Sequence, residues 1–258
     1  MLHWNLPPLL SSLLLVLTAS KLGSSQTSAP TVKYTATLGE NVVCLSEFNA
    51  AREAAGLANF IKAPKENELT DPQTELEEEW KKVCTHLIPS EETEGAAKSS
   101  SANPFEDGTY GFKRLADAEP NCKEAVDYWN AAFKNFTGLP PSKTEGTDLY
   151  KKQDNVSFVA LYNPSSNATA DCRVVTCTQT TTSGSLPATA TSGGESGTTK
   201  NGYALICKTM PTAFANDTSA PFTQEQWDRI KSSLTGSASI AAPCLAAFLI
   251  VALGITSL

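Results

Sequence analysis

The residues of this chain best suited to covalent chemistry are its cysteines, of which it has seven. Cys244 lies inside an apolar stretch at the end of the chain, and the other six lie before it: Cys44, Cys84, Cys122, Cys172, Cys177 and Cys207. An even number of cysteines in a secreted chain predicts three disulfides. A zinc site is disfavoured, because no Cys-x-x-Cys pair occurs and His86 is the only histidine between the two apolar ends of the chain.

The spacing of two cysteines excludes one pairing. Cys172 and Cys177 lie five positions apart in "CRVVTC", a segment typical of a strand. Five positions along a strand place the two side chains on opposite faces and about 16 Å apart, which is too far for a disulfide. Each must therefore pair elsewhere. Many pairings stay open, and we expect Cys177 to pair with Cys207 on a neighbouring strand.

The search for catalytic motifs finds no pattern that supports an enzyme. The chain has no Gly-x-Ser-x-Gly, no Walker loop, no Gly-x-Gly-x-x-Gly and no His-Glu-x-x-His. A hydrolase built on a histidine would have to use His86, which falls at the edge of a helical apolar stripe. The carboxylates of "ELEEEW" follow one another at a helix start and are typical of a solvated face. We therefore expect no catalytic activity, no metal and no cofactor.

Four Asn-x-Ser/Thr sequons are candidate attachment sites for N-linked glycans: Asn135, Asn155, Asn167 and Asn216. Such sites suit a secreted protein at a cell surface. Asn135 follows a helix-like sequence and Asn155 begins a strand-like run, so the local pattern favours these two less.

The first residues of the chain are typical of a secretory signal peptide. An apolar run is followed by small residues up to Ser25, which predicts a removed segment over residues 1–25. No lysine or arginine precedes the apolar run, which departs from the usual pattern. The alternative is a buried N-terminal helix, and Pro7 and Pro8 make it the weaker interpretation.

The last residues predict a glycosylphosphatidylinositol (GPI) anchor. Residues 240–258 are uncharged and mostly apolar, and no basic residue flanks them on the far side. The small residues Gly236, Ser237, Ala238 and Ser239 stand before this run and are the candidate attachment residues. Small residues followed by a terminal apolar tail form the GPI signal, so residues 237–258 are expected to be removed. A membrane-spanning tail anchor is the alternative.

What remains between the two ends, residues 26–236, is long enough for one domain with a sizeable core. The chain has a formal net charge of −7 and no evident basic patch. This balance argues against nucleic acid as a partner and against direct electrostatic binding to anionic lipid. Membrane attachment is therefore expected through the GPI lipid alone.

Apolar spacing predicts four helices, over residues 44–57, 70–87, 121–136 and 222–234. In the second, Thr70 or Asp71 is expected to cap the start. Its buried stripe comprises Leu76, Trp80, Val83, Cys84 and Leu87.

The last helix carries two start signals. Thr223 and Gln226 form a capping box, and Phe222 is placed to pack against Trp227.

Strands are expected at residues 108–115, 156–163, 172–179 and 203–209. A Thr/Ser/Gly-rich stretch over residues 180–202 is typical of a surface hairpin tip. Helices, then strands, then a closing helix predict an α+β domain, with helices covering a mostly antiparallel sheet in an α/β/α arrangement.

The segment "EFNAAREAAGL" resembles the first-helix motif of the CAP superfamily (cysteine-rich secretory proteins, antigen 5 and pathogenesis-related proteins). Asn49, Arg52, Gly56 and Leu57 match that motif, while Phe48 stands where the family has histidine. The resemblance implies a CAP-like sandwich. The departure at Phe48 argues against the metal-binding cleft linked to that family.

Over most of its length the chain is similar to the GPI-linked surface antigen (SAG) family of Eimeria. The pieces that carry this similarity occur in order: "CLSEFNAAREAAGLANF", "YWNAAFKNFTGLPP", "VALYNP", "DCRVVTC", "YALICKTMP" and "FTQEQWDRIKSSLTGSAS". The resemblance implies a CAP-like domain that coats invasive stages of the parasite. It also implies attachment to host cells and contact with host immune proteins, without catalysis. The alternative is a CAP-type secreted binder of sterol or fatty acid, which would need a deep apolar groove.

Overall fold

The computed structural model describes residues 28–89, 105, 107–184 and 197–236. The signal-peptide and tail predictions, including Ser237, Ala238 and Ser239, lie outside these residues. The strands are β1 (Ser28–Leu38), β2 (Ile61–Lys62), β3 (Thr109–Leu115), β4 (Thr169–Gly184) and β5 (Gly197–Met210). The helices are α1 (Leu45–Ala54), α2 (Glu78–Leu87), α4 (Cys122–Asn130), α5 (Thr147–Tyr150), α6 (Gln153–Leu161) and α7 (Gln224–Thr235), with 3-10 turns at Lys65–Asn67 and Ala131–Asn135.

The strands form one five-stranded sheet in the order β1-β4-β5-β3, all antiparallel. The short β2 pairs in parallel with the start of β4. The sheet is thus mostly antiparallel, as expected, and the chain is an α+β domain.

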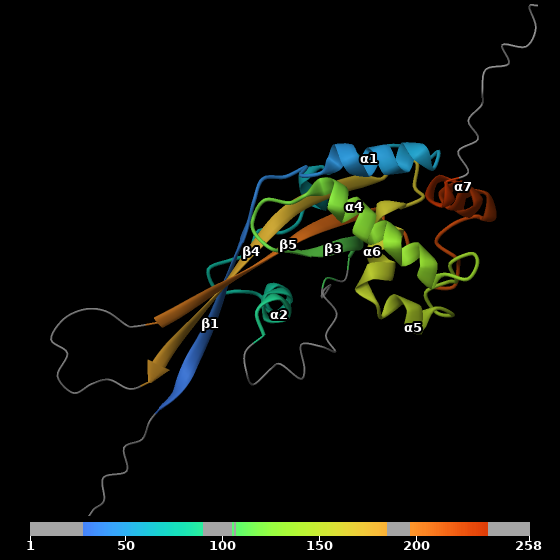
Figure 1. Ribbon diagram of the computed structural model, residues 1–258. Coiled ribbons are helices and arrows are strands. Elements are labelled where there is room, and N and C mark those ends of the chain that lie inside the picture. Colours follow the sequence, from blue (N-terminus) through green and yellow to red (C-terminus); the bar gives the residue numbers. More distant parts are fainter. Residues whose placement is uncertain (1–27, 90–104, 106, 185–196, 237–258) are drawn as a thin grey trace, which may run out of the picture.

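Helices cover both faces of the sheet, and Figure 1 shows α1 and α4 on one side of the strands and α2 on the other. The first face packs against α1, α4, α6 and α7 through residues such as Phe48, Trp129, Phe158 and Ile230. The second face packs against α2. Antiparallel strands alternate their side chains between faces, so the sheet supplies apolar residues to two separate cores.

The structure has three disulfides. Cys84–Cys177 joins α2 to β4, Cys172–Cys207 joins β4 to β5 within the sheet, and Cys44–Cys122 joins the starts of α1 and α4. The expected Cys177–Cys207 pairing is wrong. In the register of β4 and β5, Cys207 lies directly opposite Cys172 and Gly202 lies opposite Cys177. Cys177 faces the other way and reaches Cys84 on α2. The prediction that Cys172 and Cys177 point to opposite faces is confirmed.

Two glycines allow close approach between the sheet and the helices that cover it. A Cβ at Gly111 of β3 would lie 2.8 Å from the Trp129 ring, and one at Gly202 of β5 would lie 2.8 Å from Ile88. Contacts that short do not occur in folded proteins, so these positions exclude any larger residue unless α4 or the end of α2 moves.

Several predicted elements are confirmed. The helices at 44–57 and 121–136 and the strands at 108–115, 172–179 and 203–209 are present, within a few residues at their ends. The capping box of Thr223 and Gln226 is formed, and Phe222 stacks on Trp227 with ring centroids 6.3 Å apart.

Two predictions about elements are wrong. The predicted strand over residues 156–163 is wrong, because residues 156–161 belong to helix α6. Phe158, Val159, Ala160 and Leu161 are all buried, and a continuous apolar run has no period that tells a helix from a strand.

The other wrong prediction concerns the start of the second helix. It begins at Glu78, not at Thr70 or Asp71. The backbone N–H of Leu69 donates to Asp171 and the Asp71 carboxylate pairs with Arg173, which holds this segment against the sheet in a non-helical path.

The Cys84–Cys177 disulfide closes the longest loop, with a sequence separation of 93 between its cysteines, whereas the separation of Cys172 and Cys207 is 35. We predict that Cys84→Ser with Cys177→Ser lowers the free energy of unfolding by about 4 kcal/mol, because the unfolded chain regains the entropy of that loop. Cys172→Ser with Cys207→Ser should cost roughly 1 kcal/mol less. Urea denaturation followed by circular dichroism measures both, and an unchanged midpoint for the Cys84/Cys177 variant would contradict the prediction.

Candidate functional site

Two residues that match the CAP motif, Asn49 and Arg52, hold the turn after α1 in place through hydrogen bonds to the backbone. Asn49 Oδ1 accepts a hydrogen bond from the backbone N–H of Phe60 at 2.7 Å, and Asn49 Nδ2 donates to the Phe60 carbonyl at 3.3 Å. Arg52 Nε donates to the Ala58 carbonyl at 2.7 Å and Arg52 Nη1 donates to the Leu161 carbonyl at 2.9 Å. These bonds fix the turn after α1 and attach it to the end of α6.

Arg52 is fully buried, and its guanidinium carbon lies 3.8 Å from the centre of the Phe60 ring. Burial lowers the pKa of Arg52 to about 10, an effect that Tyr162 partly offsets, so the side chain is still charged at neutral pH. Within the described residues no carboxylate forms an ion pair with it. The charge of Arg52 is stabilised instead by two carbonyl oxygens and by the face of the Phe60 ring.

His86 lies in the last turn of α2, against Phe112 of β3. Its ring lies edge-on to Phe112, with centroids 5.6 Å apart, and its backbone carbonyl accepts a hydrogen bond from Arg114. All six cysteines before the tail are in disulfides and cannot act as thiol nucleophiles. Across the described ranges, no group of three His, Cys, Asp or Glu side chains is arranged to hold a metal ion.

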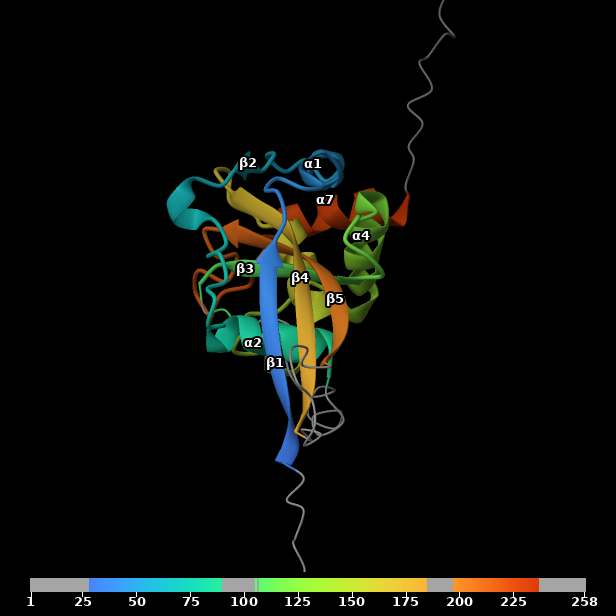
Figure 2. The same cartoon turned by 90° about the vertical axis from the view of Figure 1, so that its left-hand side faces the viewer.

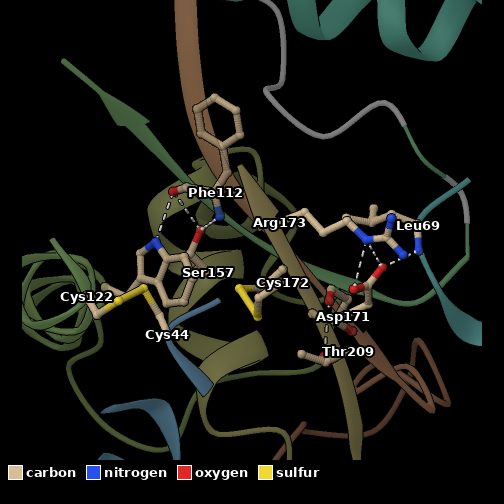
Figure 3. The surroundings of a disulfide bond; sticks show 12 residues. Cys44, Leu69, Phe112, Cys122, Ser157, Asp171, Cys172, Arg173 and Thr209 are labelled. Atoms are coloured by element: carbon tan, nitrogen blue, oxygen red, sulfur yellow. Dashed lines mark hydrogen bonds and ion pairs between the residues drawn. A yellow bond between two sulfur atoms is a disulfide. The ribbon is translucent and has the colours of Figure 1, made fainter. Parts of the chain in front are cut away.

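An ion-pair cluster lies on the α2 side of β4. Arg173 Nε donates to both carboxylate oxygens of Asp171, at 3.1 and 2.9 Å, and Arg173 also pairs with Glu68 at 3.0 Å. Figure 3 shows Asp171 also accepting from the backbone of Leu69. Burial lowers the pKa of Arg173, but hydrogen bonding and charge from Asp171 outweigh it and raise the pKa overall.

The Arg173 cluster was not foreseen from the sequence, because its members are about 100 residues apart. Asp171 and Arg173 stand two positions apart on one strand, which could have suggested a shared face. The cluster points inward and binds the segment before α2 to the sheet. It therefore serves the fold, and Asp71 stays largely exposed at its outer end.

The four sequons differ in their access to solvent. Asn167 and Asn216 are exposed, and Asn135 is half-buried. Asn155 is fully buried in α6. Its Nδ2 donates to the Leu149 carbonyl, and its Oδ1 accepts from Asn135. A glycan on Asn155 is therefore incompatible with the packing of α6.

Among the hollows on the described surface, three are open to solvent, and none of these three is a closed apolar groove. One of about 410 Å³ lies between Trp80 and Phe105 and is bordered by carboxylates. One of about 380 Å³ lies beside Lys143 and Tyr150, and one of about 330 Å³ lies beside Asn163. A sterol or fatty acid would need a longer apolar channel than these provide.

The most distinctive surface is a three-stranded arm where β1, β4 and β5 extend past the helices (Figure 1). One face of the arm continues the side that carries α1 and α4. At the four outward positions of β4 on this face stand Thr176, Thr178, Thr180 and Thr182. The register places Thr37, Thr35, Lys33 and Thr31 of β1 beside them, and Tyr203, Asn201, Thr199 and Gly197 of β5 on the other side. We call these twelve residues the threonine face.

The arm and the end of α7 lie at opposite ends of the molecule in both views (Figures 1 and 2). Helix α7 is packed on the core through Trp227 and Ile230 and ends at Gly236, which is exposed and has φ +60°. A left-handed glycine is a common way to end a helix. Gly236 is the one candidate anchor residue that the structure describes.

Comparison with known proteins decides the family. A model of the sporozoite surface antigen (SAG) protein domain matches residues 40–249, which is most of the chain. The chain belongs to the SAG family. Among the relatives of this SAG protein, the sporulated oocyst TA4 antigen of Eimeria tenella is 28% identical over 202 residues, covering 74% of each chain. No solved structure matches.

Membership confirms the resemblance to Eimeria surface antigens and makes this SAG protein a parasite surface antigen. The match begins at residue 40, so β1, which forms the outer edge of the arm, lies before the matched region. The threonine face is thus partly built by residues outside the family domain.

Because the fully buried Arg52 donates hydrogen bonds to two carbonyls, we predict that Arg52→Lys lowers the free energy of unfolding by about 2 kcal/mol. Lysine has a single ammonium group in place of the forked guanidinium, so it cannot reach both carbonyls. Arg229→Lys is the matched control. Its guanidinium pairs with an exposed Glu225, and this pair contributes at most about 0.5 kcal/mol. Equal denaturant midpoints for the two variants would contradict the structural role of Arg52.

For the sequons, we predict N-linked glycans on Asn167 and Asn216 and none on Asn155 when the chain is secreted from a eukaryotic cell. Intact mass before and after glycosidase treatment should lose one glycan with Asn167→Gln and one with Asn216→Gln. The Asn155→Gln variant should lose none. A glycopeptide containing Asn155 in folded, secreted protein would contradict the burial described above.

Proposed function

We propose that this SAG protein is a non-catalytic antigen, tethered by a GPI lipid to the outer face of the parasite plasma membrane. Its folded domain contacts host cells and host immune proteins. Family membership is the observation that carries the proposal. A CAP-like α/β/α sandwich is part of it, supported by the first-helix motif and by the helices on both faces of the sheet.

The end of the described chain supports the lipid tether. Helix α7 ends at an exposed glycine, directly before a cluster of small residues and an apolar tail. An enzyme that attaches the lipid needs such a segment to be accessible. Among the helices that the structure describes, none is long and apolar enough to cross a bilayer.

The chemistry of the domain supports a binding role rather than catalysis. The buried cationic groups among the described residues, Arg52, Arg173 and Lys208, are held by backbone carbonyls or by carboxylates of the fold. The disulfides and the exposed sequons suit an extracellular protein. A secreted sterol or fatty-acid binder has less support, because the hollows at the surface are open and border polar groups.

The tether is tested by treating cells that display the full chain with phosphatidylinositol-specific phospholipase C. We predict release of the protein into the medium, lacking residues 240–258 by mass spectrometry. A control chain in which residues 240–258 are replaced by a membrane-spanning helix with basic flanks should stay on the cells. Retention of the parent protein with its tail attached would contradict the anchor.

A further inference from the structure

Strand β1 forms one edge of the sheet. Among the described residues its strand neighbour is β4, with which it pairs over residues 31–38, and Figure 2 shows it at the outer side of the arm. The short β2 lies on the same side of β4 but pairs only with residues 169 and 170, so it does not cover β1. An edge strand leaves a row of backbone N–H and C=O groups without strand partners.

The register shows which backbone groups of β1 face outward. The Gly39 N–H donates to the Val174 carbonyl at 2.8 Å, where the ladder of β1 and β4 continues. Hydrogen-bonded and non-hydrogen-bonded pairs alternate along an antiparallel ladder, so the odd-numbered residues of β1 bond to β4. The N–H and C=O groups of Val32, Tyr34 and Ala36 therefore point away from β4. Among the described residues, none forms a hydrogen bond with these outward groups.

The outer edge of β1 has few of the features that prevent strand pairing. Sheet edges are commonly protected by charged residues, prolines or bulges. Over residues 31–38, β1 has one charged residue, Lys33, no proline and an unbroken register. Val32 is 39% exposed and lies beyond the part of β1 where Tyr34 and Leu38 pack on the α2 side. This edge can therefore accept another strand.

The opposite edge of the arm is less suited to pairing. Residues 197–202 of β5 extend past β3, whose pairing with β5 ends at Tyr203. This stretch contains Gly197 and Gly202, which weaken a strand, and it carries Lys200. The β1 edge is therefore the better surface for a partner strand.

The same strand of a second copy is a partner that fits β1. Residues 28–38 contain no acidic residue, so two copies of the strand bring no carboxylates together, although the whole chain has a net charge of −7. When two copies are related by a two-fold axis, residue i contacts residue j and residue j contacts residue i. The possible registers differ in the residue that lies opposite itself.

Two of these registers are disfavoured. With Lys33 opposite itself, two like charges meet directly, which destabilises a sheet. With Tyr34 opposite itself, Pro30 lies opposite Leu38 and has no N–H to donate to it.

A register with Thr35 opposite itself has neither problem. Val32 then lies opposite Leu38 of the second copy, which pairs two apolar side chains on the α2 side. Lys33 lies opposite Thr37 on the threonine face, about 14 Å from the second copy's Lys33. Each outward N–H in the paired stretch then meets a carbonyl of the other copy.

We propose that β1 pairs antiparallel with β1 of a second copy of this chain, with Thr35 opposite Thr35 at the two-fold axis. The two arms then form one continuous sheet, and both threonine faces lie on the same side of it. Backbone hydrogen bonds hold the pair, and a contact between Val32 and Leu38 closes each end. This inference goes beyond the proposed function and depends on neither the lipid tether nor contact with the host.

Cysteine cross-linking of the full chain in mild detergent tests the register. Residues directly opposite each other in a non-hydrogen-bonded pair have Cα atoms about 4.5 Å apart, within the range of a disulfide. We expect Thr35→Cys to form a covalent dimer under mild oxidation, above the background of the parent chain.

Lys33→Cys is the matched control, because Lys33 is also exposed and lies on the same face of β1. It should form no dimer above the background, since its two copies lie too far apart for a disulfide. Lys33→Cys with Thr37→Cys should restore the dimer, because these positions face each other. Equal dimer yields from Thr35→Cys and Lys33→Cys, or no dimer from Thr35→Cys, would overturn the proposal.

A proline at the outer edge tests the backbone pairing. Val32→Pro removes an N–H that points away from β4, so the ladder with β4 is kept. In the Thr35→Cys chain it should slow dimer formation about tenfold, because two symmetry-related hydrogen bonds are lost. Val32→Ile keeps the N–H and an apolar side chain, and should leave the rate unchanged. Equal rates for the two variants would contradict pairing through this edge.

Hydrogen exchange of the parent chain distinguishes what covers the edge. The amides of Val32, Tyr34 and Ala36 should exchange more slowly as the protein concentration rises. Slow exchange at every concentration would show that a segment of the same chain covers the edge, and fast exchange at every concentration would show that the edge is unpaired. Either result overturns the proposal and leaves the proposed function in place, since neither measurement involves the tether or a host cell.

Discussion

Two disulfides attach to β4 on its opposite faces, and the rest of the structure depends on this arrangement. Cys172 bonds to the neighbouring strand on the side of α1 and α4, and Cys177 bonds to α2 on the other side. An odd spacing along a strand is what sends the two sulfur atoms in opposite directions. Asp171 and Arg173, on the α2 side, add an ion-pair cluster that holds the segment before α2. One strand is thereby bonded to its neighbouring strand on one face and to α2 on the other.

The arm begins where these attachments end. Beyond Cys177, β4 pairs with β1 and β5 but has no disulfide and fewer helical neighbours, so its side chains can be polar. Threonine suits this position because it favours strands while presenting a hydroxyl to solvent. The fold thus separates two tasks: the bonded centre supplies stability, and the arm supplies a surface whose composition is free to serve recognition.

The sequence predicted the features that depend on local spacing. The alternation along "CRVVTC" placed Cys172 and Cys177 on opposite faces, and the capping box of Thr223 marked the last helix. The sequence could not predict the register between β4 and β5. That register brings Cys207 opposite Cys172, so that Cys177 bonds to Cys84 on α2 instead. Residues 156–163 were misassigned because residues 157–161 of α6 are all buried, and such a run shows no apolar stripe.

For the region around Asn49 and Arg52 and for the threonine face, the sequence indicated the composition but not the arrangement. Asn49 and Arg52 match the CAP motif and suggested a CAP-type site. In the structure both side chains form hydrogen bonds that hold the turn after α1. The threonine-rich stretch was expected to be a loop tip, and β1 was not foreseen. The threonine face exists only because β1, β4 and β5 align in register, and such long-range pairing cannot be read from one strand.

Peptide mapping of the non-reduced protein tests the central arrangement most directly. Trypsin cleaves after Arg173 and so separates Cys172 from Cys177, which lets mass spectrometry assign each bridge. The structure predicts linked peptides for Cys84–Cys177, Cys172–Cys207 and Cys44–Cys122. A linked peptide that joins Cys177 to Cys207 would contradict the account, since α2 would then have no covalent attachment to β4.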